Sequence, residues 1–154
     1  MKPRSNIFQT APDASKAMIE VEKCIEGSGL EYSLLELVRI RASQINGCAF
    51  CINMHVGDAL KNGEQPMRIH LLDAWRDSPL YSDRERAALG WTEALTKVAK
   101  THAPDPDYEL LKSQFNDSEI GYLTLLIGQI NAWNRIQIGL RAVHSVAPPV
   151  TAAA

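Results

Sequence analysis

The chain has 154 residues, of which 45% are hydrophobic and 22% are charged, and its formal net charge is −2. These values are typical of a single soluble globular domain over residues 1–154, and they favour neither nucleic acid nor an anionic membrane as a partner. No apolar run follows the basic start MKPR, and no apolar segment reaches the length of a membrane span. We therefore expect a cytoplasmic protein without a signal peptide.

Hydrophobic residues recur with a helical period along the chain, and no segment shows the strict alternation of a strand. The expected fold class is therefore all-α, a compact multi-helix bundle with a core over residues 14–146 and loose ends in the first ten residues and in the tail APPVTAAA. In chain order, the pattern predicts helices at 14–25, 33–45, 48–61, 66–75, 84–100, 107–115 and 120–146.

Turn and capping residues set the boundaries between these predicted helices. The dipeptide Asn-Gly at 46–47 ends the second helix, because glycine readily adopts the left-handed conformation that terminates helices. Ser82 with Glu85, and Asn116 with Glu119, have the three-residue spacing of a capping box. Each of these pairs therefore predicts the start of a helix.

Two predicted helices, at 33–45 and 120–146, carry apolar side chains around most of their circumference. Such helices are buried, either within their own domain or by another subunit. A chain of this length has limited room for two of them, so we expect a homo-oligomer. The alternative is a monomer built around one central helix.

The segment NGCAFCINMH, at residues 46–55, contains the strongest chemical signal. On a helix, Cys48, Cys51 and His55 lie within about 60° of one another. Cys48 is expected near the helix N-terminus, where free N–H groups and the helix dipole favour a thiolate. A redox centre is the favoured interpretation, with a zinc site and inert buried cysteines as alternatives. We assign no chemistry to the third cysteine, Cys24.

Glu36 is a carboxylate within one of the two most apolar predicted helices. Such a group costs free energy unless it is paired or functional. Desolvation would raise its pKa toward neutrality, which suits a proton acceptor. The other interpretation is an ion pair with Arg39, three residues further along the same helix.

Glu36, Cys48, Cys51 and His55 together resemble the Glu-x11-Cys-x2-Cys-x3-His motif of alkylhydroperoxidase D-like proteins, within the carboxymuconolactone decarboxylase-like superfamily. The resemblance covers about residues 30–140. It implies an all-helical fold assembled as trimers or hexamers. It also implies thiol-dependent reduction of a peroxide, with no bound metal or organic cofactor.

One position departs from the best-known branch of that family, which has a histidine where this chain has Phe50. The expected proton relay is therefore shorter. Decarboxylase members of the superfamily generally lack the cysteine pair, so its presence argues against their chemistry. Phe50, Ile52 and Met54 suggest apolar surroundings, which favours an organic hydroperoxide as substrate. Tyr32, Asn131 and Trp133 are further candidates to line the pocket, and the sequence assigns them no role.

The hypothesis for the mechanism follows from this resemblance. Glu36 and His55 draw a proton from Cys51, whose thiolate attacks the peroxide and becomes a sulfenic acid. Cys48 condenses with it to a disulfide, which an external dithiol or protein thiol reduces by attack on Cys48, expected to be the more exposed sulfur. Two other functions stay open: a dithiol relay that serves a partner protein, and a non-redox lyase or binding module of the same fold.

Overall fold

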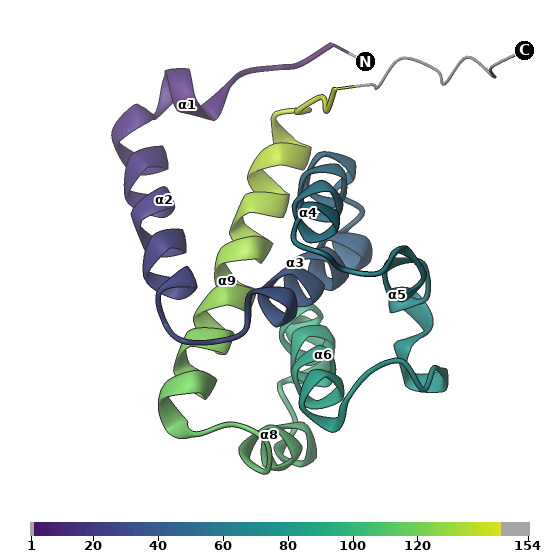
Figure 1. The fold of residues 1–154 in the computed structure, drawn as a ribbon. Coiled ribbons are helices and arrows are strands. Elements are labelled where there is room, and N and C mark those ends of the chain that lie inside the picture. The colour runs from purple at the N-terminus through teal and green to yellow at the C-terminus, as the bar shows by residue number, and fades with distance from the viewer. Residues whose placement is uncertain (1, 146–154) are drawn as a thin grey trace, which may run out of the picture.

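The computed structural model describes residues 2–145, which form helices joined by short turns and contain no strand (Figure 1). The expected all-α fold class is confirmed. The helices in chain order are α1 (Ile7–Thr10), α2 (Pro12–Glu26), α3 (Tyr32–Asn46), α4 (Ala49–Lys61), α5 (Pro66–His70), the 3-10 helix η1 (Leu72–Asp77), α6 (Asp83–Thr96), α7 (Val98–Thr101), α8 (Asp105–Lys112) and α9 (Asp117–Gly139).

Three predicted helices are shorter or more divided than expected. The helix predicted at 66–75 is two elements, α5 and η1, with non-helical backbone at Ala74. The helix predicted at 84–100 is interrupted at Lys97, which lies between α6 and α7. The last helix ends at Gly139 because Arg141 adopts a left-handed φ of 55°, and the N–H of Ala142 turns back to the carbonyl of Gln137. The remainder of that prediction and the tail lie outside the described residues.

Both predicted capping boxes are confirmed. The Ser82 hydroxyl accepts from the Glu85 N–H at 3.2 Å, and the Glu85 carboxylate accepts from the Ser82 N–H at 2.8 Å. Asn116 and Glu119 make the equivalent pair of bonds at 3.0 and 2.9 Å. An N-cap of this kind typically stabilises a helix by about 1 kcal/mol. These local bonds position the starts of α6 and α9.

Helix α3 is buried by its own chain. Every residue from Leu34 to Ser43 is buried, and the helix packs against α4, α6 and α9. The apolar circumference of this helix therefore does not by itself require a second subunit. It places α3 at the centre of the fold, where Glu36 becomes an interior group.

Helix α9 packs against α2 and α3 (Figure 1). It is only partly covered, because Leu125 and Ile138 are each 45% exposed. Homo-oligomerisation stays a prediction; α9 exposes Leu125 and Ile138 along its length, whereas α3 exposes Tyr32, at 39%, at its first position. The buried residues of α9 are Ile120, Leu123, Leu126, Ile127, Ile130, Asn131, Asn134 and Gln137.

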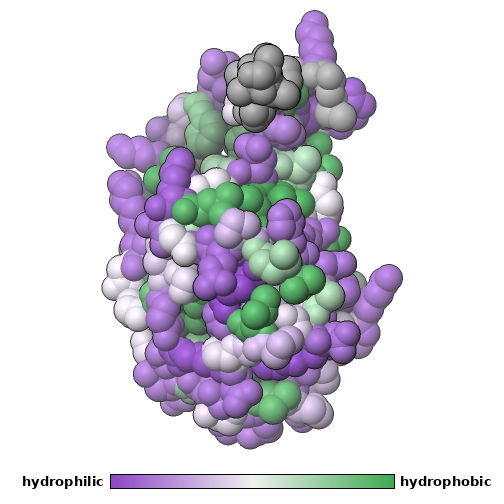
Figure 2. Space-filling model, turned by 45° about the vertical axis from the view of Figure 1, so that its right-hand side comes forward, coloured by the Kyte–Doolittle hydropathy of each residue, from purple (hydrophilic) through white to green (hydrophobic). Residues whose placement is uncertain are grey.

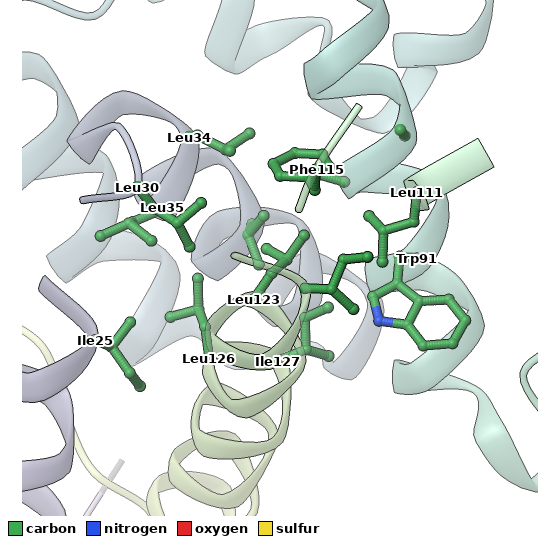
Figure 3. Close-up of a cluster of buried hydrophobic side chains, with 14 of the residues drawn as sticks. Ile25, Leu30, Leu34, Leu35, Trp91, Leu111, Phe115, Leu123, Leu126 and Ile127 are labelled. Carbon is green, nitrogen blue, oxygen red and sulfur yellow. The ribbon is translucent and has the colours of Figure 1, made fainter. Parts of the chain in front are cut away.

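One hydrophobic cluster joins α3, α6, α8 and α9 (Figure 3). Leu123 and Ile127 of α9 lie in it beside Trp91 of α6. Leu111 of α8 and Phe115, which follows α8, close it at 0% and 5% exposure. This cluster supports the end of the bundle opposite the chain termini.

The first residues are ordered, in contrast to the expectation of a loose end. The N–H of Arg4 donates to the Leu140 carbonyl at 2.9 Å, and its guanidinium donates to the Gly139 carbonyl. In α1, Phe8 stacks on Trp133 with ring centroids 6.1 Å apart. The local sequence contains no sign of these contacts, because their partners lie at the far end of the chain.

The surface alternates between polar and apolar side chains. Figure 2 shows a face on which hydrophobic patches are interrupted by hydrophilic residues. Within residues 2–145, no helix combines the length and the apolar character needed to cross a membrane.

Two neighbouring leucines of α8 test this packing. Leu111 is 0% exposed, whereas Leu110 is 61% exposed. Leu111→Ala is expected to lower the free energy of unfolding by about 2–5 kcal/mol, because it leaves a cavity in the cluster. Leu110→Ala is the matched control and should change it by less than about 0.5 kcal/mol. Urea unfolding measures both, and equal losses would contradict the assignment of the core.

Candidate active site

The turn between α3 and α4 places the cysteines. Gly47 has φ 72° and ψ 32°, a left-handed conformation that glycine adopts at little cost. The N–H of Cys48 returns to the Ser43 carbonyl at 3.0 Å, and Cys48 becomes the N-cap of α4. The expected position of Cys48 at a helix N-terminus is confirmed.

A buried amide network fixes this turn against α9. The Asn46 amide donates to the side-chain oxygens of Asn131 and Asn134 at 2.9 and 2.8 Å. Asn134 in turn donates to the Ser43 hydroxyl at 2.9 Å. Asn131 therefore supports the turn and is not among the pocket residues, so the prediction that it lines the pocket is wrong.

Cys48 and Cys51 form a disulfide with their Cα atoms 5.3 Å apart. Both are buried, at 1% and 2% exposure, so the prediction that Cys48 is the more exposed sulfur is wrong. The two differ in their surroundings: Cys51 lines a pocket that Glu36 and His55 also line, and Cys48 does not. Cys24 is a free thiol, exposed on α2.

Glu36 contacts two partners through its two oxygens. Oε1 accepts from Nη1 of Arg39 at 2.6 Å, and Oε2 lies 3.0 Å from Nδ1 of His55. The side chains of Glu36 and Arg39 are 2% and 3% exposed. Glu36 therefore makes the ion pair with Arg39 and also contacts His55. The two interpretations of Glu36 from the sequence, an ion-pair partner and a functional carboxylate, are compatible in this geometry.

Burial alone would raise the pKa of Glu36, as expected from the sequence. The hydrogen bond and charge of His55, with the charge of Arg39, outweigh that effect and hold the pKa below its ordinary value. The expected rise in pKa is thus wrong, because sequence reasoning included the desolvation but not both cationic partners. Glu36 is an ionised carboxylate at neutral pH.

The ionised state of Glu36 determines how a neutral His55 can act. A carboxylate only accepts hydrogen bonds, so Nδ1 of His55 carries the proton and donates a hydrogen bond to Oε2 of Glu36. The other ring nitrogen, Nε2, is then unprotonated and can act as a base. Cys51 lies one helical turn before His55, and both residues line the same pocket.

Arg39 connects this pair to α2. Its Nη2 donates to Glu22 at 2.8 Å and lies 3.3 Å from Glu26. The other oxygen of Glu22 accepts from the indole N–H of Trp133 at 3.0 Å. Residues from α2, α3 and α9 are thereby joined on one side of the pocket.

The pocket has a volume of about 380 Å³. The sequence predicts Tyr32, Phe50, Met54 and Trp133 in this region, and all four line it, whereas Ile52 does not. Burial, followed by the charges of Glu36 and Asp58, raises the pKa of Tyr32. The lining residues that sequence reasoning missed are Phe8, Ile19, Glu22, Glu26, Asp58, Ile130 and Gln137.

Six of the missed residues belong to α1, α2 and α9, and their spacing along the chain contains no signal that they face the cysteines. The seventh, Asp58, lies on α4 three residues after His55, a helical spacing that places it on the same side of the helix as His55. For the described part of the chain, no three His, Cys, Asp or Glu side chains are grouped so that they could hold a metal ion.

Comparison with known proteins places the chain among relatives. Residues 12–94 match the carboxymuconolactone decarboxylase family. The uncharacterized protein YdfG of Bacillus subtilis (strain 168) is 40% identical over 140 residues, which cover 91% of this chain and 95% of that protein.

Two solved structures are also similar. One, from Agrobacterium tumefaciens, is described as a protein of unknown function and proposed to be the antioxidant defence protein AhpD. It is 46% identical, has a TM-score of 0.92, and the match covers 95% of this chain and 100% of that chain. The other is an uncharacterized peroxidase-related protein from Silicibacter sp. TM1040, with 24% identity, a TM-score of 0.73, and coverage of 82% and 67%. At that identity the likeness shows the fold alone.

The lowered pKa of Glu36 predicts a pH dependence of stability. Its ionised form stabilises the fold above the unfolded-state pKa, and this contribution is lost as the pH falls from about 4.5 through the lower folded-state pKa. Glu36→Gln should therefore flatten the decline in the free energy of unfolding below about pH 4.5. Urea unfolding at a series of acidic pH values measures this slope. Glu20→Gln, which alters an exposed carboxylate on α2, is the control, and an equal slope in Glu36→Gln would contradict the prediction.

Proposed function

The chain belongs to the carboxymuconolactone decarboxylase family, and we propose that within this family it is a thiol-dependent peroxidase that reduces organic hydroperoxides. One observation carries the proposal: Cys51, half of a Cys-x2-Cys disulfide, lines the same largely apolar pocket as the Glu36–His55 pair. A nucleophilic thiol, a base and a substrate space are thus available together.

In the proposed reaction, Nε2 of His55 takes the proton of the Cys51 thiol. The thiolate attacks the terminal oxygen of the hydroperoxide, the O–O bond breaks, and the alkoxide takes up a proton to leave as an alcohol. Cys51 is now a sulfenic acid. The thiol of Cys48 attacks its sulfur, water leaves, and the Cys48–Cys51 disulfide forms. The hydroperoxide is reduced by two electrons, and the two thiols are oxidised by two.

An external dithiol returns the protein to the reduced form in two exchange steps. Greater exposure does not favour attack on Cys48, since both sulfurs are buried and Cys51 is the one that lines the pocket. We therefore place the first attack at Cys51, with Cys48 as the leaving sulfur. The N–H of Cys51 points to the Cys48 sulfur at 3.3 Å and would stabilise the departing thiolate.

The similar structure from Agrobacterium tumefaciens supports this assignment, because that protein is proposed to be the antioxidant defence protein AhpD. A cytoplasmic setting belongs to the proposal, since reductants there keep thiols reduced. A dithiol relay would instead pass electrons to a partner disulfide faster than to a hydroperoxide. A non-redox lyase or binding module would keep its function after both cysteines are replaced.

The two cysteines are expected to fail differently. Cys51→Ser should abolish consumption of cumene hydroperoxide, because it removes the attacking thiolate. Cys48→Ser should permit one turnover and leave a sulfenic acid on Cys51, because the resolving thiol is gone. Peroxide assays with mass spectrometry of the 48–55 peptide measure both, and Cys24→Ser serves as the control. If Cys48→Ser cycles normally, or if the oxidation maps to Cys48, the roles are reversed.

Glu36→Gln tests the base. Arg39 only donates hydrogen bonds, so the amide oxygen should face Arg39 and the NH₂ group should face Nδ1 of His55. The proton of His55 then moves to Nε2, which can no longer accept one from Cys51. We expect a loss of about 10²–10⁴-fold in peroxidase rate.

The Cys51 thiolate, followed by absorbance at 240 nm, should form only at higher pH in this variant. Glu20→Gln is the matched control on an exposed carboxylate. Full activity of Glu36→Gln with an unchanged thiolate titration would reduce Glu36 to a structural partner of Arg39.

A further inference from the structure

Charge is unevenly distributed around the pocket that contains Cys51. Four carboxylates line it, those of Glu22, Glu26, Glu36 and Asp58, and Arg39 supplies the one guanidinium or ammonium group among its described lining residues. The pocket is therefore net negative whichever form His55 adopts.

Arg39 is not available to a ligand. Its side chain is 3% exposed, and its Nη1 is bound to Glu36 while its Nη2 is bound to Glu22 and Glu26. Lys61 lies 3.3 Å from Asp58 but is not a lining residue, and its side chain is 77% exposed. Water screens such a pair strongly. An anionic ligand in the pocket would thus find no free guanidinium or ammonium group among the described lining residues.

The other residues that line the pocket are mostly apolar. The pocket volume of about 380 Å³ is in the range of small-molecule sites, about 300–1,000 Å³. The raised pKa of Tyr32, to which Glu36 and Asp58 contribute after burial, is consistent with a negative field in this space. The apolar lining residues are Phe8, Ile19, Phe50, Met54, Ile130 and Trp133.

We propose that this pocket selects uncharged, apolar hydroperoxides over carboxylated ones of the same size, with Glu26 and Asp58 as specificity-determining residues; the inference rests on the peroxidase function proposed above. A carboxylated substrate must lose water on entry and meets like charges without a cationic partner. Glu26 and Asp58 are the partly exposed members of the set, with side chains 47% and 39% exposed, so they face an entering molecule from the solvent side.

The test compares kcat/KM for cumene hydroperoxide and its para-carboxylated analogue, which share the ring and the reacting group. The neutral substrate should be preferred by about tenfold or more at low salt. The preference should shrink between about 0.01 M and 1 M salt, as the Debye length falls from about 30 Å to about 3 Å.

Glu26→Gln combined with Asp58→Asn should reduce the ratio of kcat/KM for the neutral substrate to kcat/KM for the carboxylated one by about threefold or more. The double substitution removes two negative charges that would repel the carboxylated substrate at the solvent side of the pocket. Glu20→Gln is the control, since Glu20 is an exposed carboxylate of α2 that does not line the pocket. A ratio near one, a preference for the carboxylate, or an equal ratio in the double variant would overturn the proposal.

A binding measurement separates this inference from the peroxidase function. Calorimetry with the product alcohol, 2-phenyl-2-propanol, and its para-carboxylate uses the disulfide form and needs no turnover. Tighter binding of the neutral alcohol without any consumption of hydroperoxide would support the selectivity while refuting the peroxidase. Equal binding of the two alcohols, or tighter binding of the carboxylate, would overturn the selectivity whether or not the protein reduces peroxides.

Discussion

The burial of the Arg39 guanidinium among carboxylates is the constraint on which the candidate site depends. An unpaired charge at 3% exposure would cost several kcal/mol, so the arginine requires partners in place. Glu36 is one of them, and it uses only one oxygen for this pair. The other oxygen remains free for His55. A structural ion pair therefore keeps a carboxylate ionised and oriented in the interior, and the histidine acquires a defined tautomer as a result.

The same guanidinium determines how the pocket is closed. Helix α2 buries only Ser15 and Ile25, so apolar packing contributes little to its position. Its Glu22 joins Arg39 to Trp133, and Trp133 supports Phe8 by stacking. A chain of contacts thus joins Arg39, in the centre of the site, to the aromatic side chains of Trp133 and Phe8 that line the pocket. The acid–base pair and the apolar binding surface are parts of one connected arrangement.

Phe50 belongs to the apolar binding surface of the pocket and not to its acid–base pair. Phe50 lines the pocket, so this position contributes apolar surface and no group that could carry a proton. In the proposed mechanism, proton transfer at Cys51 depends on His55 and Glu36. The turn that presents the cysteines is held separately, by Asn46 and its partners on α9. Chemistry, binding and support therefore come from different side chains.

Features that arise within a few residues of one another could be predicted from the sequence. The helical periodicity, the two capping boxes and the turn at Gly47 are local, and they predicted the all-α class and the start of α4 correctly. Each depends on the backbone geometry of a single helix or of a single helix end. The roles assigned to Glu36, Cys48, Cys51 and His55 stay a prediction.

Features that depend on contacts between distant segments exist only in the folded chain. Trp133 and Glu22 are 111 positions apart, as are Gln129 and Met18, whose bond also joins α9 to α2. Such pairings cannot be inferred from spacing, so the order of the N-terminal segment, the part of the pocket formed by α1 and α2, and the contacts of Asn131 were missed. The pKa of Glu36 belongs here as well, because its direction depends on whether Arg39 and His55 both reach a buried carboxylate, and that is a property of packing.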